Sequence, residues 1–156
     1  MKSLRKFLQL APARRGLLVE AAVGLPLAWL LVRLMPFRFW STWLGEAAPG
    51  EADPPATPET QAAYDVGWAV RTTNRTVGGR YTCLMQAMAA QWMLSRRHVP
   101  TSLVLGTLTE RGEDNQLVIK AHAWLKVNGR TVLGDTGERF TAVSSYVRRH
   151  PQPVED

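Results

Sequence analysis

The sequence predicts an α+β domain in which helices come before an antiparallel sheet, and three observations indicate this. Two segments with apolar residues at helical spacing fill residues 61–97. Two segments with strand character follow, at residues 102–108 and 116–127. The pair Asn128-Gly129 comes next, and it predicts a tight hairpin because a type I′ turn needs positive φ at both central positions.

Length and composition set limits on the class of protein. At 156 residues, with 46% hydrophobic and 21% charged residues, the chain fits one globular domain and does not fit general disorder. A single cysteine, Cys83, excludes an internal disulfide framework. We therefore expect a reducing compartment, the cytoplasm.

The positive charge is concentrated at the N-terminus. The net charge is +6, and residues 1–45 hold seven basic side chains against Glu20 alone. The remainder of the chain is balanced, whereas a general nucleic-acid binder would carry a basic face on its core. An acidic membrane surface or a partner protein remains open as the target of this segment.

Residues 1–45 are predicted to form basic, aromatic-rich helices. Within them, residues 16–34 are almost all apolar and approach the length that spans a bilayer. Because Glu20 and Pro26 interrupt this run, we expect two buried or interfacial helices broken around Pro26. A membrane anchor with a cytoplasmic N-terminus is the alternative.

Residues 46–60 contain four prolines and no large apolar side chain, and we interpret them as a linker before a core at 61–150. The core opens with a helix for which Thr57 is the predicted N-cap and Pro58 the first-turn proline. Its apolar positions recur at helical spacing: Ala62, Ala63, Val66, Ala69, Val70 and Val77.

A second helix is predicted from Cys83 to about Arg97, with Thr82 as its cap, and it is apolar on nearly all sides. Such a helix is expected to be buried in the centre of the domain. In the strand at 102–108, Gly106 is a candidate bulge, and from Ser144 we expect a short helix before Pro151.

The hairpin turn sets which residues face each other. Counting outward from a two-residue loop, Leu125 faces Val132 and His122 faces Asp135, with directly opposite Cβ atoms about 5 Å apart. This register predicts a carboxylate beside an imidazole, where it fixes which ring nitrogen is free to act as a base. The alternative is an ordinary polar pair on a solvated face.

Cys83 adds a possible nucleophile to the pair of His122 and Asp135. A cysteine at a helix start lies where backbone amides and the helix dipole favour the thiolate. Cys83, His122 and Asp135 then supply a nucleophile, its base and the group that orients the base. The alternatives are a buried small side chain at Cys83 and a zinc site built from the three residues. The layout is that of the papain and transglutaminase-like folds.

Two stretches, "CLMQAMAAQWML" and "AHAWLKVNGRTVLGD", resemble the lasso peptide biosynthesis B2 proteins, which are stand-alone leader peptidases of the transglutaminase-like superfamily. The N-terminal "FLQLAPARRGLLVEA" and "LMPFRFWSTWLG" are also similar to that family. The resemblance implies a cysteine protease that removes the leader from a ribosomally made precursor peptide. It also implies two partners, a separate leader-recognition protein and an asparagine synthetase-like macrolactam cyclase. ATP would enter through that cyclase, and no cofactor or metal is expected in this chain.

Carried onto this sequence, the resemblance makes Cys83 the nucleophile, His122 the base and then the acid, and Asp135 the orienting carboxylate. The backbone N–H of Cys83 is the expected oxyanion donor, with the side chains of Gln86 and Arg80 as candidates for a second. Trp124, two residues after His122, is expected to line the cleft.

The chain departs from the family pattern at two positions, because His98 stands where a helix-ending glycine is frequent and Lys126 where an acidic residue is frequent. Two other functions stay open: a transglutaminase-like acyltransferase, and a non-catalytic scaffold that docks on a membrane or partner. Three N-terminal tryptophans could then form a docking surface for the leader-recognition protein: Trp29, Trp40 and Trp43.

Overall fold

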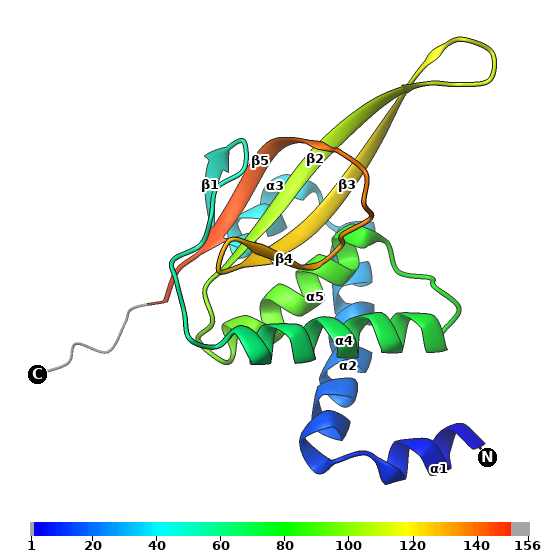
Figure 1. Cartoon of the computed structure of the whole chain (residues 1–156), viewed down its shortest axis with the longest axis vertical. Helices are drawn as coiled ribbons and strands as arrows, with labels where there is room; N and C mark the ends of the chain where they lie inside the picture. The colour runs from blue at the N-terminus through cyan, green and yellow to red at the C-terminus, as the bar shows by residue number, and fades with distance from the viewer. Residues whose placement is uncertain (1, 151–156) are drawn as a thin grey trace, which may run out of the picture.

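Helices come first and the main strands second along the chain, as Figure 1 shows for the computed structural model, which describes residues 2–150. The N-terminal helices are α1 (Lys2–Gln9), α2 (Pro12–Leu34), α3 (Phe37–Trp40) and the 3-10 turn η1 (Ser41–Leu44). The core helices are α4 (Thr60–Thr76) and α5 (Cys83–Ser95). The strands are β1 (Glu46–Pro49), β2 (Thr101–Arg111), β3 (Leu117–Val127), β4 (Arg130–Leu133) and β5 (Thr141–Arg148).

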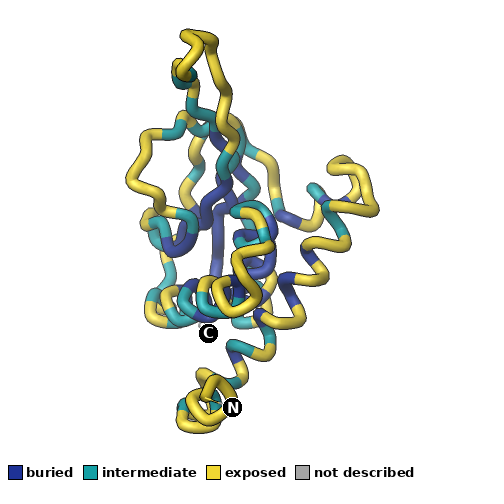
Figure 2. Tube along the Cα trace, turned by 90° about the vertical axis from the view of Figure 1, so that its right-hand side faces the viewer, coloured by how far each residue is buried: buried dark blue, intermediate teal, exposed yellow. Residues whose placement is uncertain are grey.

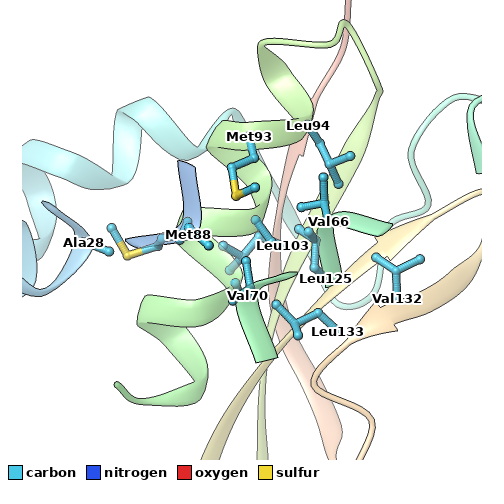
Figure 3. Packing of buried hydrophobic residues seen from close by; sticks show 14 of the residues in the cluster. Ala28, Val66, Val70, Met88, Met93, Leu94, Leu103, Leu125, Val132 and Leu133 are labelled. Atoms are coloured by element: carbon cyan, nitrogen blue, oxygen red, sulfur yellow. The ribbon is translucent and has the colours of Figure 1, made fainter. Parts of the chain in front are cut away.

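The five strands form one antiparallel sheet in the order β1-β5-β2-β3-β4. Helix α5 packs against β3 and β2, and α2 and α4 pack against α5. Figure 3 shows this core, in which side chains from α4, α5 and the strands interleave. The α+β class with an antiparallel sheet and preceding helices is thus confirmed.

Helix α5 forms as the sequence predicts. Thr82 caps it by accepting a hydrogen bond from the Met85 amide over 3.4 Å. Most of its side chains are buried, as expected for a helix that is apolar on all sides. At its end His98 adopts a φ of 56°, and the Val99 amide bonds to the Leu94 carbonyl. His98 therefore takes the left-handed position that a glycine usually occupies.

The hairpin turn is confirmed, but the register beyond it is not. Asn128 and Gly129 have φ values of 53° and 71°. The pairing then slips, because Leu125 faces Leu133 and Val132 becomes the extra residue of a bulge. Strand β4 ends at this point, so the predicted cross-strand pair of His122 and Asp135 is wrong.

Helix α2 continues through Pro26, so the prediction of two helices broken there is wrong. Pro26 is exposed, where water can satisfy the carbonyl that loses its partner. Glu20 receives two hydrogen bonds from Arg97 of 2.9 and 2.8 Å, which fasten α2 to the end of α5. Among the described residues α2 is the one helix long and apolar enough to cross a membrane, although part of it is buried against the core (Figure 2).

Residues 46–60, interpreted as a linker, contain strand β1 and are fastened across the sheet. The Asn128 side chain bonds to the backbone N–H and C=O of Thr57, over 2.7 and 2.5 Å. These bonds hold Thr57 outside the helix, so α4 begins at Thr60 rather than directly after the predicted cap.

Strand β5 replaces the short helix expected from Ser144. It fills the gap between β1 and β2 and pairs with both. The register of β2 against β5 shifts between Leu105 and Gly106, so there is a bulge at this point, but its extra residue is Val143 of β5 rather than Gly106. A Cβ at Gly106 would lie 2.6 Å from the Trp124 ring, so the glycine lets that ring pack over the strand.

Candidate active site

The start of α5 is held in place by side chains from two helices. Asn74 is buried in α4, receives a 3.0 Å hydrogen bond from the Tyr81 amide and donates one of 3.2 Å to the Tyr81 carbonyl. Gln86 donates to the same carbonyl over 3.1 Å. The Cys83 side chain is half-buried and packs against the hydrophobic core. The amides that begin a helix have no partner inside it, so the Cys83 N–H is available to an oxyanion.

His122 lies in an aromatic group on β3. Its ring stacks on Trp124 at a centroid distance of 6.1 Å and contacts Phe140 at 4.9 Å. Its Nε2 lies 2.6 Å from the carbonyl oxygen of Gly134, which accepts a hydrogen bond when that nitrogen carries the proton. A backbone carbonyl therefore orients the imidazole in this structure.

Asp135 follows Gly134 directly and is exposed. Its Oδ1 accepts a 3.0 Å hydrogen bond from the Gly137 amide, which makes an Asx turn rather than a bond to His122. His122 and Asp135 nevertheless line the same pocket of about 360 Å³, together with Trp124, Phe140 and others. The structure thus brings the predicted base and carboxylate to one cavity without joining them directly.

Cys83 and His122 approach β3 from its two faces. Ala123 and Leu125 belong to the core against which α5 packs, and alternation along the strand turns His122 and Trp124 to the other face. Within residues 2–150 no hydrogen bond joins the Cys83 sulfur to the His122 ring, and Cys83 does not line the pocket of His122. Because β4 ends at Leu133, the edge of β3 beside His122 is not covered by that strand.

A model of the transglutaminase-like superfamily matches residues 21–145, which include α5, β3 and the Asp135 loop. The chain belongs to this superfamily. Its members are generally cysteine proteases or transferases that use a Cys-His-Asp triad. No curated protein and no solved structure matches the chain.

The other residues singled out in this superfamily domain have different surroundings. The amide of Gln86 is committed to the Tyr81 carbonyl, so it positions the loop before α5. Arg80 is exposed in that loop. Trp124 is buried and lines the pocket of His122. Sequence reasoning missed Asn74 and Phe140, because a lone Asn or Phe carries no spacing signal before the fold is known.

Lys126 stands where the resemblance described above led us to expect an acidic residue, and it pairs with two acidic side chains of the segment between β1 and α4. Its ammonium group lies 2.8 Å from Glu51 and 2.5 Å from Asp53. Burial acts to lower the pKa of Lys126, but the hydrogen bonds to Asp53 and Glu51 outweigh it, and its pKa is raised. Through these two ion pairs, Lys126 holds residues 51–53 against the sheet.

Among the described residues, no three His, Cys, Asp or Glu side chains are grouped so that they could hold a metal ion. This arrangement does not favour the alternative of a zinc site built from Cys83, His122 and Asp135.

Proposed function

We propose that this chain is a cysteine peptidase that removes the leader from a ribosomally synthesised lasso peptide precursor. Cys83 is the nucleophile, His122 the general base and acid, and Asp135 the carboxylate that stabilises the imidazolium. A separate leader-recognition protein presents the precursor in the cytoplasm, and an ATP-dependent asparagine synthetase-like cyclase closes the ring on the released core.

One observation carries the proposal: the histidine and the aspartate share a single pocket on a strand that packs against the helix begun by the only cysteine. Membership of a superfamily that generally uses this triad supports it. Because Cys83 and His122 approach β3 from its two faces, the proposal requires the start of α5 and the His122 ring to come together when a precursor is bound.

The reaction is acyl transfer to water. The Cys83 thiolate adds to the carbonyl carbon at the leader–core junction, and the helix-start amide stabilises the oxyanion. The C–N bond breaks as the His122 imidazolium gives its proton to the departing amine, leaving a thioester. His122 then takes a proton from water, the hydroxide adds, and the C–S bond breaks to release the leader acid.

The first test is cleavage of a precursor in a reconstituted assay with its recognition protein. We expect Cys83→Ala to lower kcat/KM by about 10³-fold or more, because it removes the only thiol. Ser144→Ala, a similar truncation on β5, is the matched control and should retain activity. Full cleavage by Cys83→Ala would remove the residue as nucleophile.

A second test asks whether His122 acts on Cys83. Since Cys83 is the only cysteine of the chain, the rate of alkylation by iodoacetamide reports on this thiol alone. If the imidazolium stabilises the thiolate, His122→Ala should slow alkylation near neutral pH about ten-fold. An unchanged rate across the pH range would show that the two residues do not form one unit.

An acyltransferase is the second candidate, because the superfamily includes transferases. Mass spectrometry of the products separates the two reactions. A free leader acid indicates hydrolysis, and a leader joined to another amine indicates transfer.

A further inference from the structure

We propose that the N-terminal helices dock this protein peripherally on the surface of an anionic lipid bilayer. The surface consists of α1, the outward face of α2, and α3 with η1. It is independent of the catalytic proposal, because none of its residues lines the pocket of His122.

The outward face of α2 carries an apolar stripe that no part of the described chain covers. Five side chains recur every three or four residues and are 44–70% exposed: Val19, Val23, Leu27, Leu30 and Leu34. They lie on the face opposite the buried positions Leu17, Ala21 and Ala28. Exposed apolar patches of this kind mark protein or membrane contacts.

Helix α1 has the pattern of a membrane-surface helix. Leu4 and Leu8 are exposed, and its basic residues are Lys2, Arg5 and Lys6. None of its residues is buried. A short helix with an apolar stripe and a basic face is favoured in the interface of an anionic bilayer.

The charge of this surface identifies lipid as its occupant. Seven basic residues stand in residues 1–45, and the single acid, Glu20, is already paired with Arg97 and Arg96. The segment therefore presents positive charge without a free carboxylate. Anionic headgroups complement such a surface, and the apolar stripe complements the acyl region below them.

An apolar groove continues the stripe. It has a volume of about 320 Å³ and lies between α2, η1 and α5, with Leu27, Trp43 and Trp92 among its lining residues. Leu27 belongs to both the stripe and the groove. Tryptophan is favoured at the membrane interface, where its ring is apolar and its N–H is polar.

The core prevents α2 from spanning the bilayer while the domain stays folded. Leu17, Ala21, Leu25 and Ala28, in the middle of the helix, are buried, and α2 packs against α4 and α5 (Figure 2). The helix therefore lies in the interface, with its other face in contact with the domain. Figure 1 places α1 and the β2–β3 hairpin at opposite ends of the molecule, so the contact made by α1 lies far from that hairpin.

The experiment is flotation of the full chain with vesicles. We expect it to float with vesicles containing about 30% phosphatidylglycerol and at least ten-fold less with phosphatidylcholine alone. Raising NaCl from about 0.05 to about 0.5 M should release the protein, because salt screens the attraction. Alkaline carbonate should also release it, whereas retention there would indicate insertion and overturn peripheral docking.

Matched variants locate the contact. Lys2→Gln/Arg5→Gln/Lys6→Gln should weaken binding about 100-fold, at about five-fold for each charge. Arg75→Gln/Arg111→Gln/Arg130→Gln removes the same charge elsewhere and should bind like wild type. Equal loss in both triple variants would mean that net charge alone drives association, which overturns the proposed surface.

A second pair of variants tests the apolar contribution to vesicle binding. Val23→Gln/Leu30→Gln should reduce binding at least ten-fold, and Leu117→Gln/Ile119→Gln, on exposed apolar residues of β3, should not. Absence of flotation with anionic vesicles would overturn the proposal. A concentration-dependent dimer that Val23→Gln/Leu30→Gln abolishes would also overturn it, because the stripe would then be a protein contact. Precursor cleavage in solution should be unchanged in all four variants, so this failure and a failure of the peptidase proposal are distinguishable.

Discussion

At the scale of single residues, Gly134 determines how the imidazole of His122 is held. Its carbonyl oxygen is 2.6 Å from His122 Nε2, and its φ is 91°, in the region that favours glycine. A Cβ at this position would lie 2.7 Å from the Ala123 carbonyl oxygen. Glycine is therefore required for the chain to pass beside β3 and present its carbonyl to the ring.

Because of this contact, we expect the loss of Asp135 to cost less activity than the loss of His122. Asp135→Ala should lower kcat/KM for precursor cleavage by about 10–100-fold, because the Gly134 carbonyl still orients the ring while the negative charge in the pocket of His122 is lost. His122→Ala should cost about 10³-fold or more. Steady-state kinetics on the same precursor make the comparison.

Asp135→Asn is the matched control, because it keeps an acceptor for the Gly137 amide and removes only the charge. If Asp135→Ala proved as severe as His122→Ala, the carboxylate rather than the carbonyl would hold the ring during turnover.

The identities of the candidate residues could be predicted from the sequence, whereas their mutual geometry could not. The chain has one cysteine, at a capped helix start, and a histidine that precedes a turn with an unambiguous signature. The bulge that separates His122 from Asp135 depends on packing of β4 against α4, which leaves no mark in the local sequence. Asn74 acts across seven residues on Tyr81, and no motif signals that contact.

At the scale of elements, α4 rests directly on the backbone of β4 through Gly67. A Cβ there would lie 2.6 Å from the Val132 carbonyl oxygen, which also accepts a 3.1 Å hydrogen bond from Arg71. Gly67→Ala should therefore destabilise the fold by about 1–3 kcal/mol, although alanine is the better helix former. Urea unfolding measures the change.

Gly16→Ala in α2 is the matched control. Nothing lies within 4 Å of a Cβ at Gly16, so the substitution should stabilise by up to about 1 kcal/mol. A gain of stability at Gly67 as well would show that α4 and β4 can separate without cost.

Elements with strong local signals formed where predicted, and elements that depend on distant partners did not. Helix α5, strand β3 and the hairpin turn follow from the cap, the alternation and the Asn-Gly pair. Strand β5 depends on pairing with β2, about 40 residues earlier, so its short "TAVSSYVR" did not identify it. Helix α2 passes through Pro26 because its packing on α4 and α5 exceeds the local cost of the proline.

At the scale of the whole molecule, Glu20 joins the N-terminal helices to the core through its ion pairs with Arg97 and Arg96. The hydrogen bond from Arg97 lowers the pKa of Glu20, burial opposes it, and the charges of Arg97 and Arg96 lower it further. A carboxyl whose pKa is lower in the folded than in the unfolded state stabilises the fold above its unfolded value. That contribution disappears as the pH falls through the folded value.

Glu20→Gln should therefore reduce the free energy of unfolding by about 1 kcal/mol at pH 7, since the pair is bidentate but partly exposed. The difference from wild type should shrink as the pH falls below the ordinary glutamate pKa and should vanish once the pH lies below the lowered pKa of Glu20 in the folded state. Glu113→Gln, in the exposed turn between β2 and β3, should leave the pH dependence parallel to wild type. Urea unfolding across this pH range tests the prediction, and a Glu20→Gln curve that runs parallel to wild type would show that the ion pair does not hold α2 to the domain.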